Sequence, residues 1–232
     1  MSHETSYRFI GRGLYSLPDA ERLTRIPRVR IRRWMEGYHY VNNGQRRSSR
    51  PIIQSDIGRE VGELALTFAD LMEIRFLDDF RKRGVSWRSI RIAAHRVRKL
   101  VDSTHPFSNK KFKTDGETIL AEITQRGHGD KLLDLVRNQW EITSIVTPTL
   151  FEGIEFNHSD DPTLWWPLKG ARVIIDPQRA FGAPIVVDGS VQTRVLASAA
   201  KAEGSQRAAA EMFRVSTGAV RDAIKFESRF AA

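Results

Sequence analysis

The sequence predicts an α+β fold that is rich in helices, with short hairpins between them. Helix-start and helix-end residues punctuate the first hundred positions, Asn-Gly and Asp-Gly dipeptides separate short apolar runs, and the chain closes with helical segments. The length of 232 residues fits one or two domains. We expect an N-terminal domain over 1–103, a mixed α/β middle region over 104–170, and a C-terminal domain over 171–232.

The composition excludes several classes of protein. The chain has no cysteine, which excludes a disulfide framework, a thiolate zinc site and a thiol nucleophile. No apolar run approaches the roughly 18 residues that span a bilayer. The N-terminus "MSHETSYRF" lacks the apolar core of a secretory signal. We therefore expect a soluble cytoplasmic protein without a membrane partner.

The net charge of +9 resides in one half of the chain. Residues 1–100 contain 21 Lys and Arg against 11 Asp and Glu, whereas residues 101–232 contain 16 against 17. Almost all of the positive charge in the first half comes from arginine, whose guanidinium group forms bidentate hydrogen bonds with phosphates and guanine edges. This asymmetry predicts a polyanion-binding half joined to a neutral half.

The first predicted element is a short helix that ends near Thr24. Ser16 is a good N-cap, Pro18 suits the first turn, and Asp19 favours the positive end of the helix dipole. The apolar side chains of this segment, which fall on one face, are those of Leu17, Ala20 and Leu23.

The next stretch, "RIPRVRIRRW" at 25–34, fits either a charged strand or a basic helix. As a helix opened by Pro27 and closed by Gly37, it gathers its apolar side chains on one narrow face. These are Ile31, Trp34 and Met35. If the segment were a strand, Trp34 would lie on the same face as the arginines, and the apolar and basic side chains would not be separated. We therefore predict two short helices joined by a tight turn, which is typical of a helix-turn-helix.

A basic hairpin is predicted directly after this pair. Asn43-Gly44 is a strong two-residue turn signal, flanked by Tyr40-Val41 and, beyond three arginines, by Ile52-Ile53. The arginines are Arg46, Arg47 and Arg50. In this position a hairpin is typical of the wing of a winged helix-turn-helix, and a solvated loop is the alternative.

Two further helices follow. Thr67 caps the first and Gly84 ends it, and Ser86 caps the second. The second helix carries no acidic residue from Val85 to Val101. Its basic side chains, which form either a phosphate-contacting face or an ordinary solvated face, are Arg88, Arg91, Arg96, Arg98 and Lys99.

The remainder of the chain predicts a mixed region that ends in helices. His105-Pro106 marks a candidate boundary, followed by a hairpin around Asp115-Gly116, a helix over 131–140 and a β-rich stretch over 144–156. A turn leads into a strand over 165–177, and a hairpin is centred on Asp188-Gly189. Helices then cover 193–202, 205–212 and 216–227, and the last two have a helix-turn-helix shape with mixed charge.

We find no catalytic, metal or cofactor motif. HExxH, GxSxG and the P-loop are absent, and adjacent acids such as Asp78-Asp79 diverge on a helix. The histidines, which have no partner at helical spacing, are His3, His39, His95, His105, His128 and His158. Three aromatic residues are candidates for contact with a partner protein, Trp165, Trp166 and Phe181. For the two tryptophans, burial in the hydrophobic core is the favoured alternative.

Double-stranded DNA is the expected ligand of the basic half. Arg28 and Arg30 occupy the start of the predicted recognition helix, where side chains read base edges, and arginine suits guanine O6 and N7. The side chains expected on phosphates are those of Arg32, Arg33, Arg46, Arg47 and Arg50. A basic surface without a ligand is the alternative.

The first hundred residues resemble the winged helix-turn-helix of the MerR family of transcription regulators. The resemblance rests on "SLPDAERL", "RVRIRRWMEGY" and "LTFADLMEIRFLDDFRKRGVSWRSI" in this order. It implies a homodimer on half-sites one helical turn apart. The usual aromatic pair after the recognition-helix arginine is reduced to Trp34, there is no long heptad helix, and the absence of cysteine excludes metal sensing by thiolates.

The last sixty residues resemble the small domain of unknown function found in VapB-like antitoxins. The matching pieces are the strand ending in Asp176-Pro177, the "GAPIVVDGSVQT" hairpin and the helix pair after Gly204. The resemblance implies an antitoxin that neutralises a PIN-like nuclease toxin and represses its own promoter. We therefore expect a DNA-binding antitoxin and repressor without enzyme activity. The alternatives are a stand-alone MerR-like regulator that responds to a small effector, a module that only clamps an acidic protein, and an RNA-binding enzyme.

Overall fold

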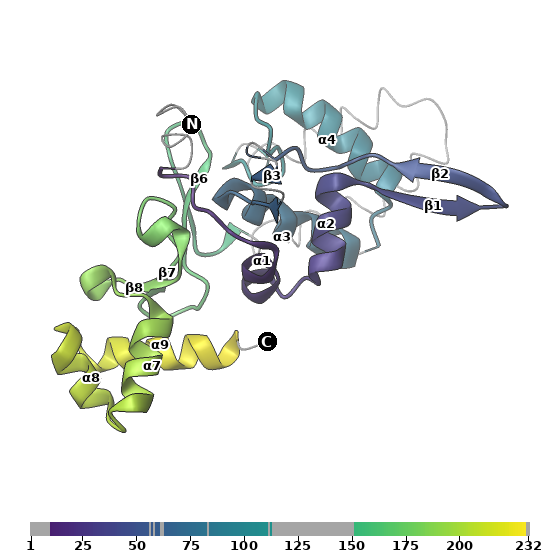
Figure 1. Ribbon diagram of the computed structural model, residues 1–232. Helices are drawn as coiled ribbons and strands as arrows, with labels where there is room; N and C mark the ends of the chain where they lie inside the picture. The colour runs from purple at the N-terminus through teal and green to yellow at the C-terminus, as the bar shows by residue number, and fades with distance from the viewer. Residues whose placement is uncertain are drawn as a thin grey trace, which may run out of the picture.

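The computed structural model describes residues 10–112, except 56, 58, 61, 62, 83 and 111, and residues 151–230 (Figure 1). These residues form α-helices and four two-stranded antiparallel sheets, which confirms the predicted α+β class. The predicted hairpin at Asp115-Gly116 and the predicted helix at 131–140 lie outside the described residues. No helix in the described part of the chain is long and apolar enough to cross a bilayer.

The first two helices are α1 (Leu17–Thr24) and α2 (Arg28–Glu36), as predicted. A capping box begins α1, because the Ser16 side chain accepts from the Asp19 N–H and the Asp19 carboxylate accepts from the Ser16 N–H. Gly37 ends α2 at φ 76°, and a Cβ there would lie 2.3 Å from the Ser49 carbonyl oxygen. Only glycine therefore allows the chain to leave α2 so close to the returning hairpin strand.

Strands β1 (Tyr38–Asn42) and β2 (Gln45–Ser49) form the predicted hairpin around Asn43-Gly44. Both turn residues have positive φ, as this turn requires. The hairpin projects from the body of the molecule (Figure 1), and its side chains from Tyr38 to Ser48 are all exposed. Ile52 and Ile53, which the sequence placed in the second arm, lie beyond it and are buried. Their N–H groups donate to the Trp34 carbonyl.

Helices α3 (Phe68–Lys82) and α4 (Trp87–Val101) complete this half, and the short pair β3 (Arg59–Glu60) and β4 (Glu63–Leu64) precedes them. Thr67 caps α3 as predicted, since its hydroxyl accepts from the Asp70 N–H at 3.1 Å. α3 is the central helix, because apolar side chains all around it are buried. They include those of Leu71, Met72, Ile74, Phe76 and Leu77.

The second half begins with two small sheets, β5 (Ile154–Phe156) with β6 (Pro162–Trp165) and β7 (Val173–Ile174) with β8 (Ile185–Val186). The sequence paired the strand at 185–186 across Asp188-Gly189, but the structure pairs it mainly with β7. The residues after β8 form a short 3₁₀ turn and return through a single bridge, Ile185 to Gln192. Pairing with the fully buried β7 stabilises β8 more than a local, solvent-exposed hairpin could.

Three helices close the chain: α7 (Thr193–Ala202), α8 (Gln206–Phe213) and α9 (Thr217–Arg229). Ser205 and Ser216 cap the last two as predicted, each accepting from the backbone N–H three residues later. Small buried side chains let these helices pack closely. They are those of Ala200, Ala209, Ala210, Ala219 and Ala223.

The two halves are in contact through α1 and α3. The Leu14 N–H donates to the Phe181 carbonyl at 3.0 Å, and Arg22 pairs with Glu227 at 3.2 Å. The ring of Tyr15 lies against Gly182, where a Cβ would come within 2.2 Å of the tyrosine oxygen. A side chain at Gly182 would therefore push the halves apart.

Candidate nucleic-acid interface

Helix α2 presents an arginine-rich face to solvent. Ile31, Trp34 and Met35 are buried as the helical wheel predicts, whereas the four arginines of the helix are exposed. These are Arg28, Arg30, Arg32 and Arg33. Val29 is also 61% exposed, between the first two arginines. Sequence reasoning did not name it as a site residue, although its place opposite Ile31 on the wheel indicates an outward position.

The two arginines expected to read bases are held by acids. The Arg28 N–H donates to Glu21 at 3.0 Å, and its guanidinium lies 3.7 Å from the same carboxylate. Arg30 pairs at 3.1 Å with Asp78 of α3, whose other oxygen lies 2.7 Å from the Lys82 amine. The Arg28–Glu21 pair is exposed on both sides and contributes at most about 1 kcal/mol of stability. Asp78, in contrast, is only 5% exposed and is shared between Arg30 and Lys82. Glu21 and Asp78 orient the guanidinium groups of Arg28 and Arg30.

The other two arginines of α2 make no ion pair with a described residue. Arg33 lies over the ring of Tyr38, with its guanidinium carbon 5.5 Å from the ring centroid. The side chain of Arg32 forms no hydrogen bond with the described part of the chain. Both side chains are therefore available to an anionic ligand.

The β1–β2 hairpin extends the basic surface. Arg46 pairs across the hairpin with Val41, and Arg47 with Tyr40, so that the two arginines point to opposite faces. Arg47 donates to the Gln45 side chain at 3.2 Å, and Arg50 follows the end of β2. The guanidinium groups of all three arginines are exposed beside α2.

Two arginines of α4 have a structural role that neither sequence alternative foresaw. Arg91 donates to the Arg50 carbonyl at 2.6 Å and to the Ser49 hydroxyl at 2.9 Å, and Arg98 donates to the Ile52 carbonyl at 2.9 Å. These bonds fix the chain where it leaves the hairpin. Arg88 is exposed, and the side chains of Arg96 and Lys99 lie outside the described residues.

A hollow of about 450 Å³ separates α2 from the end of α3 and the start of α4. Arg81 and Lys82 line it opposite Arg30 and Arg33, and the guanidinium carbon of Arg81 lies 4.8 Å from the ring centroid of Trp87. Sequence reasoning did not assign Arg81 and Lys82 to the site. The run "RKRG" at the end of the predicted helix could have indicated them. Cations at this place have a second explanation, however, because they also stabilise the negative end of the helix dipole.

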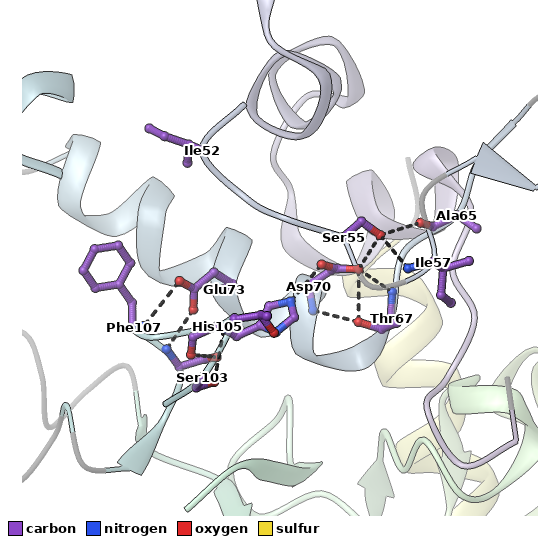
Figure 2. A network of polar contacts seen from close by, with 12 residues as sticks. Ile52, Ser55, Ile57, Ala65, Thr67, Asp70, Glu73, Ser103, His105 and Phe107 are labelled. Carbon is purple, nitrogen blue, oxygen red and sulfur yellow. Dashed lines mark hydrogen bonds and ion pairs between the residues drawn. The ribbon is translucent and has the colours of Figure 1, made fainter. Parts of the chain in front are cut away.

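A buried polar network holds α3 in place (Figure 2). One oxygen of Asp70 lies 2.9 Å from His105 Nε2, and the other accepts from the Thr67 N–H and from the Ser55 hydroxyl. His105 is only 5% exposed. His105 lies in a bend after α4 but not on the surface, because it contacts the carboxylate of Asp70, which is 35 residues earlier in the sequence.

Glu73, one turn after Asp70, is the second acid of this network. Its carboxylate accepts from the Ser108 N–H at 2.9 Å and from the Phe107 N–H at 3.3 Å. Burial raises the pKa of Glu73, and the nearby His105 and the two N–H donors oppose this effect. α3, which carries Asp78 toward Arg30, is thus tied to the segment after α4.

The three candidates for partner contact have different environments. Trp165 is buried, with the Arg75 guanidinium carbon 4.0 Å from its ring centroid, and desolvation lowers the pKa of Arg75 to about 10. Trp166 is half-buried and donates from Nε1 to Glu155 at 2.8 Å. Phe181 is 71% exposed beside Leu14, which is 44% exposed. Of the three, Phe181 offers the largest accessible apolar surface.

Comparisons with known proteins agree with this arrangement. Residues 13–94 match the family model described as "Putative DNA-binding HTH domain", which spans α1 to the middle of α4. The chain is 25% identical over 226 residues to "Putative antitoxin VapB45" of Mycobacterium tuberculosis, covering 91% of this chain and 92% of the relative.

The crystal structure of Rv2018 from the same organism aligns with a TM-score of 0.68 at 24% identity, over 90% of this chain and 96% of that one. At this identity the likeness shows a common fold. The chain therefore contains a segment similar to a helix-turn-helix DNA-binding domain, within a fold that extends over nearly its whole length.

Proposed function

We propose that this protein is a DNA-binding antitoxin that represses its own operon and neutralises a PIN-like nuclease toxin. The observation that carries the DNA-binding part is the outward face of α2, where four arginines and Val29 lie beside a basic hairpin. The antitoxin part is supported by the name of the VapB45 relative and by the resemblance of residues 171–232 to the C-terminal domain of VapB-like antitoxins.

In this proposal α2 enters the major groove as the recognition helix of a MerR-like winged helix-turn-helix. Arg28 and Arg30 near its N-terminus read guanine edges, and the methyl groups of Val29 contact a thymine methyl group. Glu21 and Asp78 hold the two guanidinium groups for this purpose. Arginine needs such orientation because bidentate hydrogen bonding to a base is strict in geometry.

Phosphate contacts supply most of the affinity. Arg32 and Arg33 extend from α2, and the β1–β2 hairpin acts as a wing that carries Arg46, Arg47 and Arg50 to the backbone. A homodimer places two such surfaces on half-sites one helical turn apart. A recognition helix of 9 residues reads only a few base pairs, so a dimer doubles the sequence that is recognised.

The toxin-binding surface is proposed around Phe181 and Leu14 at the junction of the two halves. Exposed aromatic side chains at the centre of a patch dominate the energy of many interfaces. Phe181 has a left-handed backbone, with φ 54°, that turns its side chain outward. A non-glycine residue in this conformation is strained and suggests a functional reason for its position.

The first test is a mobility-shift titration on DNA from upstream of the gene, at two salt concentrations and against a shuffled duplex. Arg28→Ala/Arg30→Ala should lose selectivity for the upstream duplex. The matched control Arg194→Ala/Lys201→Ala, which removes equal charge from α7, should retain it. Equal binding of wild type to both duplexes, or no binding, would contradict the repressor function.

The antitoxin function is tested by adding the protein to the nuclease encoded beside it and measuring RNA cleavage. Wild type should suppress cleavage, and Phe181→Ala should weaken suppression at least tenfold while DNA binding persists. Full cleavage in the presence of excess wild type would refute toxin neutralisation without touching the DNA-binding proposal.

A stand-alone regulator with a small effector is the second candidate. A hollow of about 250 Å³ lies between α1 and the start of α7, with Asp19, Arg22, Thr193 and Glu227 on its wall. Its volume is below the roughly 300–1,000 Å³ of ordinary ligand sites, and Glu227 on its wall already accepts from both Arg22 and Thr193. The antitoxin proposal is therefore the stronger one.

A further inference from the structure

The C-terminal helices α8 and α9 form a second helix-turn-helix, which the proposed function does not use. α7, α8 and α9 pack on one another around Leu196, Val220 and Phe226. The turn between α8 and α9 is tight, since Arg214 is left-handed at φ 53° and the Val215 N–H donates to the Ala210 carbonyl. Ser216 then caps α9, so that only three residues join the two helices.

The exposed face of α9 is positively charged. Thr217, Arg221, Lys225 and Ser228 follow one another at helical spacing along it, and all four side chains are exposed. Arg221 and Lys225 make no ion pair with any residue that the structure describes. Cations presented in this way, on the second helix of a helix-turn-helix, are suited to the phosphates that border a major groove.

The acids of α9 are engaged elsewhere. The Asp222 carboxylate accepts from the Arg172 N–H at 3.1 Å, and Glu227 pairs with Arg22 and accepts from the Thr193 hydroxyl. Neither carboxylate forms an ion pair with Arg221 or Lys225 in the part of the chain that the structure describes. The mixed charge of α9 thus consists of acids that bond to other elements and cations without an ion pair among the described residues.

A further cation lies at the N-terminal end of α9. Arg172 donates to the Ser216 hydroxyl at 3.0 Å, and its guanidinium would lie 2.7 Å from a Cβ at position 218. Gly218 therefore leaves room for Arg172 to lie across the first turn of the helix. Asp188 also lies near this point and accepts from the Ser216 hydroxyl at 3.0 Å.

The other end of α9 contacts the turn that leads into α2. Arg25, in the turn between α1 and α2, donates to the Arg229 carbonyl and stacks over Phe230 at 5.3 Å. In Figure 1 the yellow helix α9 accordingly ends below α1. Lys225 therefore lies about one turn from this contact, whereas Arg221 and Arg172 lie toward the other end of the helix.

We propose that α9 is a second DNA-contacting helix, which binds the phosphates flanking the half-site through Arg172, Arg221 and Lys225. This inference rests on the proposed DNA binding by α2 and extends it. The 13 residues of α9 span about 20 Å. If α9 lies along the DNA, at 3.4 Å per base pair it extends the footprint of each protomer by about six base pairs.

The test compares full-length variants on two duplexes, one limited to the core site and one with native flanks. Arg221→Ala/Lys225→Ala removes two phosphate contacts, which lowers affinity for the flanked duplex by roughly 60-fold at 0.1 M salt and the salt slope by about 1.8. On the core duplex it should bind as wild type does. The matched control is Arg194→Ala/Lys201→Ala, which removes two exposed cations of α7.

Footprinting gives the second readout. The α9 variant, which retains Arg172, should lose part of the protection of the roughly six flanking base pairs on each side and keep the core. Wild-type affinity and footprint for this variant, or an equal loss in the α7 control, would overturn the α9 proposal while DNA binding by α2 stands. If wild type protects no site and Arg32→Ala/Arg33→Ala changes nothing, both proposals fail. Circular dichroism of each variant confirms that it is folded.

Discussion

Removal of the hairpin arginines tests whether the β1–β2 hairpin contacts DNA. In Arg46→Ala/Arg47→Ala/Arg50→Ala, the backbone pairing of the hairpin should persist, because none of these side chains is buried. Surface changes of this kind alter the free energy of unfolding by roughly 0.5 kcal/mol or less. A loss of affinity can therefore be assigned to lost contacts rather than to unfolding.

The magnitude follows from counterion release. Each phosphate contact contributes about 0.9 to the salt slope, so three contacts contribute about 2.7, or roughly 500-fold in affinity at 0.1 M salt and about 80-fold at 0.2 M. Fluorescence anisotropy over a salt series measures both quantities. A control that removes three cations elsewhere, Lys169→Ala/Arg194→Ala/Lys201→Ala, should keep most of the slope. An unchanged slope in the hairpin variant, or equal losses in both, would refute the wing assignment.

The remaining predictions concern stability and selectivity. Trp165→Ala should lower the free energy of unfolding in urea by about 3–5 kcal/mol, whereas Phe181→Ala, at a 71% exposed side chain, should change it little. Burial raises the pKa of Glu73 in the folded state above its ordinary value of 4.5. The folded state therefore favours the protonated carboxyl group, and this contribution to stability is lost as the pH rises above 4.5. Wild type should therefore lose stability relative to Glu73→Gln as the pH rises above this value. Asp78→Asn releases Arg30, and competition assays should show lower selectivity with undiminished binding to random DNA.

Elements whose signals are local could be predicted from the sequence. Ser16, Ser205 and Ser216 each begin a helix by capping a backbone N–H three residues later, and Gly37 ends α2. Gly37 is a helix-end signal, although its close partner is Ser49. The serine caps involve only neighbours along the chain, so the pattern of residue types is sufficient. The same holds for the turn at Asn43-Gly44.

Features that depend on distant partners could not be predicted. The strand at 185–186 has a turn signal after it, yet it pairs with β7 because a buried strand from an earlier part of the chain is available. The sequence likewise gives no means of deciding which of two adjacent tryptophans is buried. Arg75 lies over Trp165 from a helix about ninety residues earlier, and this contact places Trp165 in the core.

The candidate site divides in the same way. The helical wheel of α2 separates its buried side chains from its arginines, so the identity of the exposed residues could be predicted. The pairing of Arg30 with Asp78, and the anchoring of the hairpin exit by Arg91, join residues more than forty positions apart. Such pairs require the crossing of α2, α3 and α4, which periodicity along one helix does not specify.

The expected boundary at residue 103 is the point at which this structure argues for a revision. Asp70 and Glu73 are buried acids of α3, and their partners on His105, Phe107 and Ser108 lie beyond that boundary. A chain cut at 103 would leave two buried carboxylates short of hydrogen bonds, at a cost of several kcal/mol. α3 also carries Asp78, which orients Arg30. We therefore propose that the DNA-binding unit extends to at least Ser108, because the residues after α4 hold the helix that positions a base-reading arginine.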